Sequence, residues 1–318
     1  MPTFCRHGRF LQNCRICSAA EKPAASTATP RRPSAAKRPS GGGRGSSAVV
    51  VRRQARSIED GYAHDLVPGL KASGDARRLA AELAFATARL GELAADPPGL
   101  YAEAALAEDR EEALWLAFTI AHLSPLAGED GPFAAIERAR STWASGAPPQ
   151  LGEGVVLGPR TTVDPRQPAR TAEAYRAWAA RAGSQAAAFA GEASWTPERR
   201  FGRLFERLSL PGFARAGRFE LLVSLGRLGL AEVEAGELRL GDAGDATTIA
   251  AKRVFGIGDT YLLERRAADL AEAAGVPLAA LDLALFNFGR PEDGRATMGA
   301  RAAGDEGLRE QVEHALGL

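Results

Sequence analysis

The 318-residue sequence is poor in cysteine (three), methionine (two), histidine (four) and aromatic residues (7%), and it has no long apolar run. A helix that crosses a bilayer needs roughly 18 or more consecutive apolar residues, which no stretch approaches, so we expect no membrane-spanning segment. The first 20 residues contain three arginines but lack the apolar core of a secretory signal, so we expect a cytoplasmic protein. Three cysteines cannot form a disulfide framework without a leftover thiol, which is typical of a reducing compartment.

The near-zero net charge of +1 conceals two opposite charges. Residues 1–56 carry twelve Lys and Arg against one acid, a net charge of +11, and the rest of the chain carries −10. A basic arm predicts a partner that carries phosphates, because Lys and Arg side chains release counterions when they bind DNA or RNA. The alternative is a solubilising arm that docks on the acidic part of its own chain.

The sequence divides into a short cysteine-containing start, a linker and a long apolar-patterned body. Residues 18–56 are rich in Pro, Ser, Gly and basic side chains, so they cannot repay the entropy of ordering, and we predict a disordered basic linker. Residues 57–318 are predicted to form one mainly α-helical domain, because β-branched residues nowhere alternate over enough positions for a sheet. Apolar spacing predicts helices at about 74–92, 101–123, 130–145 and 171–190. The stretch 151–159 is either a short strand or an extended loop, and two helix–turn–helix units follow Trp195. In the first unit, Thr196 is expected to cap a helix in which Pro197 takes the first position.

All three cysteines and one histidine fall within 13 positions, in the pattern C-x-H-x6-C-x2-C. Thiolates and an imidazole at this spacing are the ligands that a tetrahedral structural zinc site requires. We therefore predict a zinc knuckle over residues 1–17, with structural Zn as the cofactor and with Cys5, His7, Cys14 and Cys17 as ligands. A catalytic zinc is disfavoured because four protein ligands leave no position for water. A reduced, unstructured thiol cluster is the alternative.

Two glycine turns lie between predicted helices, "SLPG" at 209–212 and "FGIG" at 255–258. Backbone N–H groups at such a turn can bind phosphate without reading the base sequence, although many glycine turns only end a helix. Basic residues flank both turns. The predicted nucleic-acid contacts are Lys252, Arg253, Gly256, Gly258, Arg215 and Arg218.

The helix-forming segment 195–230 has seven arginines and three glutamates, Glu198, Glu206 and Glu220. The excess of positive charge predicts a face that contacts a nucleic-acid backbone. The glutamates are also at helical spacing for pairs within one helix, so part of this charge is expected on a solvated surface.

Asp282 is the one carboxylate in the apolar run "ALDLALFNFG". Burial raises the pKa of a carboxylate unless a cation or N–H donors compensate, which makes Asp282 a candidate catalytic group. Its alternative role is a helix N-cap. Asn287 and Arg290 follow it and are predicted nucleic-acid contacts; Arg290 is expected to reach a phosphate or to pair with Asp282. His122 is expected to be a core or capping histidine rather than a catalyst.

The glycine turn, the helix after it and the segment Gly275–Val276–Pro277 up to Leu281 and Asp282 resemble the helix-hairpin-helix DNA glycosylases. The resemblance implies a glycosylase-like helical fold with Asp282 as the catalytic carboxylate. The spacing between Gly258 and Asp282 is about one helical turn longer than in that family. Thr260 occupies the position of the Schiff-base lysine of strand-cleaving members, so no lyase step is expected. Asp259 would repel a phosphate unless it caps the following helix.

More narrowly, the sequence resembles the alpha-glutamyl/putrescinyl thymine pyrophosphorylase families of phage and bacterial DNA base-modification systems. The resemblance rests on the cysteine–histidine start, "EALWLAFTIAHLSPL", "FELLVSLGRLGL" and "KRVFGIGD…LDLALFNFGR". It implies an enzyme that acts on a flipped, modified pyrimidine such as a hypermodified thymine in double-stranded DNA, either as a glycosylase or as a transferase of the 5-substituent. The alternative is a noncatalytic DNA-binding adaptor in which Asp282 is structural. An Asp282 that opens into a pocket favours the enzyme, and one that is packed shut favours the adaptor.

Overall fold

The computed structural model describes residues 57–127, 131–291 and 294–318. The predicted zinc knuckle and basic linker lie outside these residues. The described part of the chain forms helices and no strand, which confirms the mainly α prediction. Its helices are α1 (Ser73–Ala95), α2 (Leu100–Leu106), α3 (Arg110–Leu123), α4 (Ala134–Ala139), α5 (Arg170–Arg181), α6 (Gln185–Ala190), α7 (Pro197–Arg207), α8 (Arg215–Arg227), α9 (Ala246–Phe255), α10 (Thr260–Ala274), α11 (Leu278–Phe288) and α12 (Glu306–Ala315).

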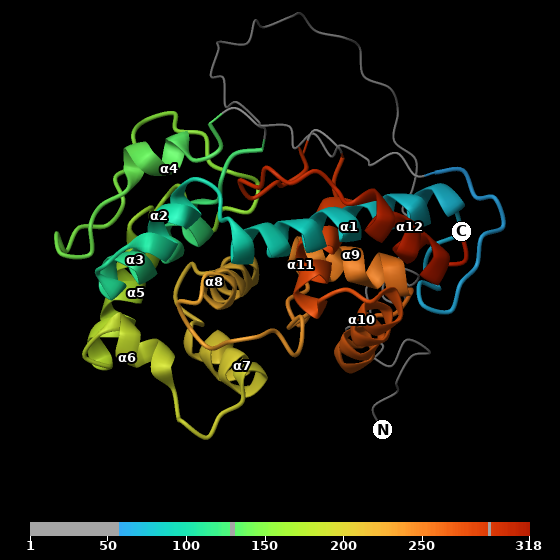
Figure 1. The fold of residues 1–318 in the computed structure, drawn as a ribbon. Coiled ribbons are helices and arrows are strands. Elements are labelled where there is room, and N and C mark those ends of the chain that lie inside the picture. The colour runs from blue at the N-terminus through green and yellow to red at the C-terminus, as the bar shows by residue number, and fades with distance from the viewer. Residues whose placement is uncertain (1–56, 128–130, 292–293) are drawn as a thin grey trace, which may run out of the picture. The chain divides into compact units, whose positions relative to one another are not determined.

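The long helix α1 is the spine of this helical body. Apolar side chains recur along one face at helical spacing, and Leu79, Leu83 and Leu93 are all buried there. The helix packs against α8, α11 and α12. Figure 1 shows α2 to α6 gathered toward the carboxyl end of α1 and α9 to α12 toward its amino end. Side chains of α1 can therefore contact both groups of helices.

Capping residues divide the helices more finely than the apolar pattern predicts. The expected helix at 101–123 is two helices, because the Asp109 carboxylate accepts a hydrogen bond from the Glu111 backbone N–H (2.8 Å) and starts α3 there. The Ser184 hydroxyl starts α6 in the same way, accepting from the Ala187 N–H (3.0 Å). Only Ala134–Ala139 is helical within the described part of 130–145, and residues 151–159 form a loop, with turns at 153–154 and 159, and contain no strand.

The two helix–turn–helix units after Trp195 are present. Thr196 caps α7 and Pro197 is its first residue, as the sequence predicts. Gly256 ends α9 in the left-handed region (φ 64°), and the Asp259 carboxylate caps α10 by accepting from the Leu262 N–H (3.0 Å). The charge of Asp259 is therefore engaged by the helix that it starts.

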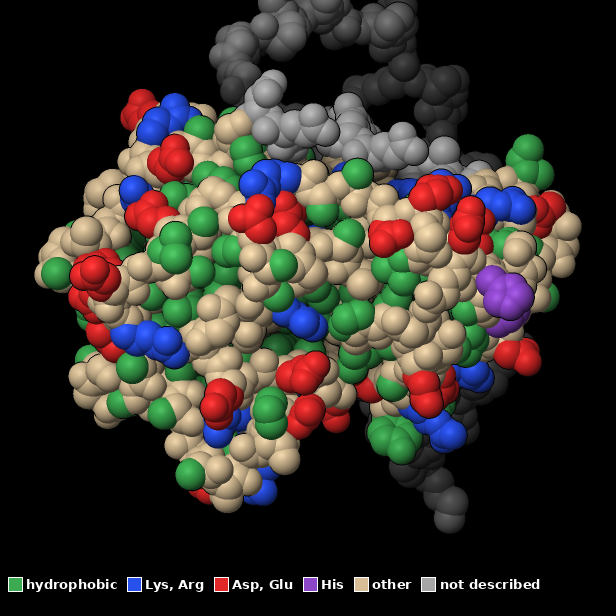
Figure 2. Space-filling view, viewed as in Figure 1, with side chains coloured by type: hydrophobic (Ala, Val, Ile, Leu, Met, Phe, Trp, Pro, Cys, Tyr) green, Lys and Arg blue, Asp and Glu red, His purple; other side chains and the backbone are tan. Residues whose placement is uncertain are grey.

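The core is continuous and rich in stacked aromatic rings around α3. The Phe118 ring lies 3.9 Å from that of Tyr175 and 5.2 Å from that of Trp115. Among the described residues, no helix combines the length and the apolar character that crossing a bilayer requires. On the face in Figure 2, basic and acidic side chains are intermixed over the surface rather than separated into patches.

Candidate functional site

Asp282 lies inside α11, five positions after the N-cap Pro277, so the N-cap interpretation is wrong. Every α11 residue from Ala280 to Phe288 is buried, because the segment is apolar on all sides and packs between α1, α9 and α10. The Asp282 side chain is 2% exposed. The fold thus places a carboxylate where only internal partners can stabilise its charge.

Two arginines from distant parts of the chain provide those partners. Arg160, in the loop before α5, donates from Nη2 to Asp282 Oδ2. Arg215, the first residue of α8, donates from Nη1 to Asp282 Oδ1 (2.7 Å). Both arginine side chains are 1% exposed. Each carboxylate oxygen of Asp282 therefore has its own guanidinium, an arrangement that suits charge-assisted hydrogen bonds.

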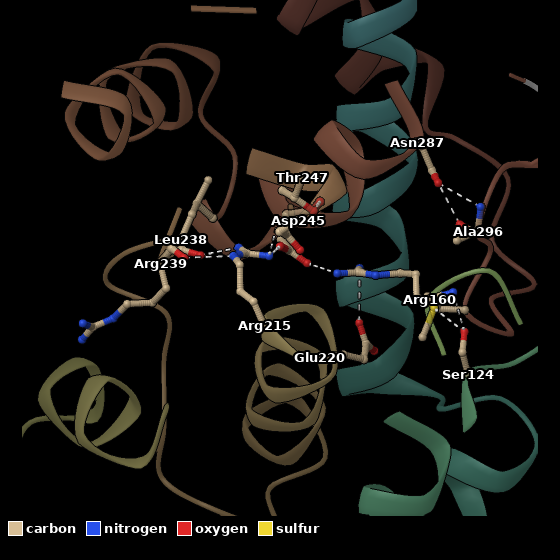
Figure 3. A network of polar contacts seen from close by, with 12 residues as sticks. Ser124, Arg160, Arg215, Glu220, Leu238, Arg239, Asp245, Thr247, Asn287 and Ala296 are labelled. Carbon is tan, nitrogen blue, oxygen red and sulfur yellow. Dashed lines mark hydrogen bonds and ion pairs between the residues drawn. The ribbon is translucent and has the colours of Figure 1, made fainter. Parts of the chain in front are cut away.

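Further charges extend this pair in both directions (Figure 3). Arg160 Nη1 lies 3.7 Å from Glu220 Oε2, and Glu220 also accepts from Arg89 Nη2, from Ser224 Oγ (3.1 Å) and from Tyr101 Oη (3.3 Å). Arg215 Nη1 lies 3.6 Å from Asp245 Oδ2 at the start of α9. We call the resulting set of three arginines and three carboxylates the buried ion network: Arg89, Glu220, Arg160, Asp282, Arg215 and Asp245.

The pairing of Asp282 with Arg160 favours the charged form of both side chains. Burial alone would raise the pKa of Asp282, but Arg160 and Arg215 outweigh it, and the pKa lies below its usual value. Burial lowers the pKa of Arg160, whereas Asp282 and Glu220 raise it more, so the guanidinium also stays charged. Asp282 is consequently an ionised group whose two oxygens are occupied, and it is not poised to take up a proton near neutral pH.

Arg215 also holds a surface loop in place. Its Nε donates to the Arg239 carbonyl (3.0 Å), and its Nη2 donates to the Leu238 carbonyl. From the other side, the Glu264 carboxylate accepts from the N–H groups of Leu238 (2.7 Å) and Leu240 (2.6 Å). Arg239 lies in the left-handed region (φ 60°), which is unusual for a residue other than glycine. Hydrogen bonds on both sides stabilise this strained turn.

A second strained point lies beside Arg160. Ser124 (φ 61°) and Met298 (φ 53°) both have positive φ, and the Ser124 hydroxyl lies 3.7 Å from the Met298 sulfur. The Arg160 backbone N–H donates to the same hydroxyl (3.3 Å). Strained residues that persist in a packed interior are often found at functional sites. This one joins the Arg160 loop to the segment after α11.

The side chain of Arg160 is not fully satisfied. Its Nε and Nη1 are buried and make no hydrogen bond with the part of the chain that the structure describes. Its guanidinium lies 5.0 Å from the centre of the Phe286 ring, and that of Arg290 lies 4.5 Å from the same ring. Burial and the nearby charge of Arg160 lower the pKa of Arg290, which is half-buried. Two cations close together in a partly dry setting favour the binding of an anion.

The predicted phosphate-binding turn lies away from Asp282. The Thr247 hydroxyl is 3.5 Å from the Asp282 carbonyl near the start of α9, while Gly256 and Gly258 are exposed at its far end. The nine-residue separation along α9 corresponds to about 14 Å. Lys252 is half-buried, and Arg253 donates to Asp75 (2.7 Å). The structure therefore does not bring the glycine turn and the carboxylate into contact.

Two other predicted nucleic-acid contacts have internal partners. Arg218 is half-buried, lies over the Phe205 ring (4.3 Å) and donates to the Phe205 carbonyl (3.2 Å). Asn287 is 1% exposed; its Nδ2 donates to Glu82 (3.0 Å), and its Oδ1 accepts from the Ala296 N–H (2.9 Å). Arg215 and Asn287 therefore lie too deep to touch a duplex unless the fold opens.

The sequence did not predict that four members of the buried ion network lie at this site: Arg89, Arg160, Glu220 and Asp245. Glu220 was expected to pair within its helix on a solvated surface, which is wrong, because it is buried and pairs with Arg89, 131 positions away. The available signal was a charged side chain on an otherwise apolar stripe, as for Arg89 on α1. Arg160, in an irregular loop, has no such signal.

The predicted zinc ligands lie outside the described residues. Within those residues, no group of three or more His, Cys, Asp or Glu side chains is arranged to hold a metal ion. The zinc site therefore stays a prediction.

Comparison with known families identifies one matching region. Residues 160–285 match the model of alpha-glutamyl/putrescinyl thymine pyrophosphorylase clade 3, which confirms the resemblance noted from the motifs. No curated protein and no solved structure matched in the corresponding searches. The matched stretch begins at Arg160 and contains five of the six members of the buried ion network, all but Arg89. The match connects the chain with enzymes of thymine modification.

Proposed function

We propose that this protein modifies thymine in DNA by exchanging a group on the base's 5-methyl carbon. The name of the matched family refers to thymine, to pyrophosphate and to glutamyl or putrescinyl groups. The observation that carries the proposal is the buried ion network, which concentrates three arginines within the matched region and its immediate surroundings. Three carboxylates match these arginines, so the group proposed to meet an anionic leaving group is Arg290, which is half-buried beside Arg160 at the Phe286 ring.

In the proposed reaction, an amine nitrogen attacks the methylene carbon attached to C5 of the pyrimidine. The new carbon–nitrogen bond forms as the carbon–oxygen bond to pyrophosphate breaks, the pyrophosphate leaves with the electron pair, and the nitrogen loses a proton. The chain's contribution would be to orient the modified base and to stabilise the charge that develops on the leaving oxygen.

Arg290 and Arg160 are the residues proposed to receive the anionic group. Arg290 is half-buried, and Arg160 lies deeper, where its Nη1 faces Glu220 at 3.7 Å and its Nε makes no hydrogen bond with the described residues. Asp282 then acts as a positioning residue, since its two oxygens fix Arg160 and Arg215. This role differs from the nucleophile-activating role that the glycosylase resemblance implies for Asp282.

Base excision is the less favoured chemistry. An excising carboxylate must approach the sugar of the flipped nucleotide, whereas Asp282 is enclosed by two guanidinium groups. Thr260 provides no amine for a Schiff base. Contact with the duplex is proposed to involve the exposed turn at Gly256 and Gly258 and the basic residues before position 57.

One assay tests the proposal against its rivals. The full-length protein is incubated with a duplex containing 5-(pyrophosphoryloxymethyl)uracil and with putrescine or glutamate, and released pyrophosphate and the masses of digested nucleosides are measured. Group transfer gives pyrophosphate and a nucleoside that has gained the amine. A free base and an abasic site would instead establish a glycosylase. Arg160→Gln should abolish turnover, and Arg140→Gln, which alters an exposed ion pair with Glu103, is the matched control.

The noncatalytic adaptor remains a second candidate because one observation favours it: the Asp282 side chain is packed shut. Under that alternative the duplex binds through the exposed turn and the basic arm. Tight binding of the modified duplex without loss of pyrophosphate or base, with either amine, would support the adaptor.

A further inference from the structure

A cavity of about 600 Å³ lies between α1, the α1–α2 link and the segment after α11. Its apolar walls include Phe85, Pro98 and Phe133, and Arg295 and Thr297 supply its polar groups. This volume and this mixture of aromatic walls with a few polar groups are typical of small-molecule sites. None of the members of the buried ion network lines it.

The aromatic wall is fixed in place. A Cβ at Gly99 or at Gly299 would overlap the Phe133 ring, so the backbone approaches this ring as closely as glycine allows. Both glycines also have positive φ, which other residues rarely adopt. The ring also packs edge-on against Tyr101, with 5.7 Å between centroids. Phe133 is 6% exposed and Phe85 is 3% exposed, so each ring presents a small, fixed apolar area to the cavity.

The polar groups suit the edge of a heterocycle. The Arg295 guanidinium lies 3.9 Å from the centre of the Phe85 ring, and Glu82 binds only its Nε (2.9 Å). The Thr297 hydroxyl is buried and has no hydrogen-bond partner among the described residues. A buried hydroxyl without a partner costs free energy that a ligand atom can recover. Together Arg295 and Thr297 offer donors and an acceptor beside an apolar wall.

A series of contacts links the segment that lines the cavity to the Arg160 loop. Thr297 precedes Met298, which contacts Ser124, and the Ser124 hydroxyl accepts from the Arg160 N–H. The segment after α11 thus carries Arg290 beside the buried ion network and Thr297 at the cavity. Ser124 and Met298 are both buried, so this link runs through packed side chains.

From this geometry we infer that the cavity receives the pyrimidine ring of the everted nucleotide, with Thr297 at its polar edge. The inference rests on the proposed function for the identity of the ring. It places base recognition at Phe85, Phe133 and Thr297, outside the residues matched by the family model.

Thr297→Val provides the sharpest test, because it keeps the side-chain volume and removes a hydroxyl that has no partner in the described fold. Binding of 5-hydroxymethyl-2′-deoxyuridine to the full-length protein is measured by calorimetry, with 2′-deoxyribose as the ring-free probe. We expect Thr297→Val to weaken nucleoside binding about three- to tenfold. Thr87→Val is the matched control, since Thr87 has a similarly buried, unpartnered hydroxyl on α1 but does not line the cavity.

A second variant covers the case in which Thr297→Val does not fold. Ala303 is exposed at the rim of the cavity, so Ala303→Trp should block the cavity without disturbing the core and should abolish nucleoside binding. Equal affinities for the wild type, Ala303→Trp and Thr297→Val would overturn the inference, as would equal binding of 2′-deoxyribose. If the variants change nucleoside binding as expected but the pyrophosphate assay yields no product, only the proposed function fails. If the pyrophosphate assay yields product but neither variant changes nucleoside binding, only the role of the cavity is excluded.

Discussion

At the scale of single residues, the free energy of the buried ion network depends on its charges being paired. Taking an ion out of water costs several kcal/mol, and a partner in the protein offsets that cost only while both charges remain. Asp282 faces two arginines, both 1% exposed. Its loss would leave two buried cations without their shared carboxylate.

We therefore expect Asp282→Asn to lower the free energy of unfolding by about 3–5 kcal/mol, as measured by urea denaturation. Glu103→Gln is the control, because Glu103 forms an ion pair of similar length with Arg140 (2.6 Å) at the surface. It should cost less than about 1 kcal/mol. Equal losses for the two variants would show that the buried ion network is not a determinant of stability.

His122 makes a separate, pH-dependent contribution to stability. It is 1% exposed, and burial lowers its pKa to about 4, from 6.5 for a free side chain. The unfolded chain therefore binds a proton between pH 6.5 and pH 4 that the folded chain does not. The contribution is fully present above pH 6.5 and decreases as the pH falls toward 4, by up to about 3 kcal/mol.

His122→Gln should flatten this pH dependence, because glutamine does not titrate and its amide can still bond to Thr162, which lies 2.6 Å from His122 Nδ1. Urea denaturation at a series of pH values checks it. Burial raises the pKa of Glu264, so Glu264 changes the free energy of unfolding with pH in the direction opposite to His122. Because Glu264 is present in both proteins, the difference between their two curves isolates His122. Parallel curves for the two proteins would contradict the assignment.

The sequence identified Asp282 as an unusual residue but not its partners. An aspartate within an apolar run is visible in a single segment, and local rules suffice to select it. Arg160 and Arg215 meet it only through the tertiary fold, 122 and 67 positions away along the chain. Pairing over such separations leaves no periodic signal, so the local reading placed Arg215 and Glu220 on the surface, where neither lies.

At the scale of helices and turns, the sequence was most informative where apolar spacing and caps agree. Thr196 and Pro197 predicted the start of α7 correctly because capping is decided by adjacent residues. The division of 101–123 at Asp109 was missed because the apolar spacing continues across the break. The glycine turn at 255–258 was recognised from its composition, and the structure shows it exposed between α9 and α10.

This turn allows a test in which folding and DNA binding separate. A Cβ at Gly258 would meet no atom within 4 Å, and its φ is not positive, so Gly258→Ala should leave the thermal midpoint unchanged. If the backbone here approaches a phosphate, the added methyl should weaken binding to a DNA duplex about tenfold, as measured by fluorescence anisotropy. Gly241→Ala, at another exposed glycine with open space, is the control. Identical affinities for the two variants would exclude the turn from the DNA interface.

At the scale of the whole molecule, the separation of charge along the sequence bears on how the protein would bind DNA under the proposed function. Residues 57–318 carry a net charge of −10, and the face in Figure 2 mixes both signs. Long-range attraction to a duplex must therefore come mainly from the +11 of residues 1–56. The proposed division of labour assigns attraction to the basic arm and recognition of the base to the helical body.

The salt dependence of binding tests this division in the full-length chain. Each phosphate that a cation neutralises adds about 0.9 to the slope of log affinity against log salt concentration. Replacing Arg31, Arg32, Lys37 and Arg38 by Gln should therefore reduce the slope by up to about 3.6, while the protein's affinity for 5-hydroxymethyl-2′-deoxyuridine stays the same. An unchanged slope would support the alternative that the arm docks on the acidic part of its own chain.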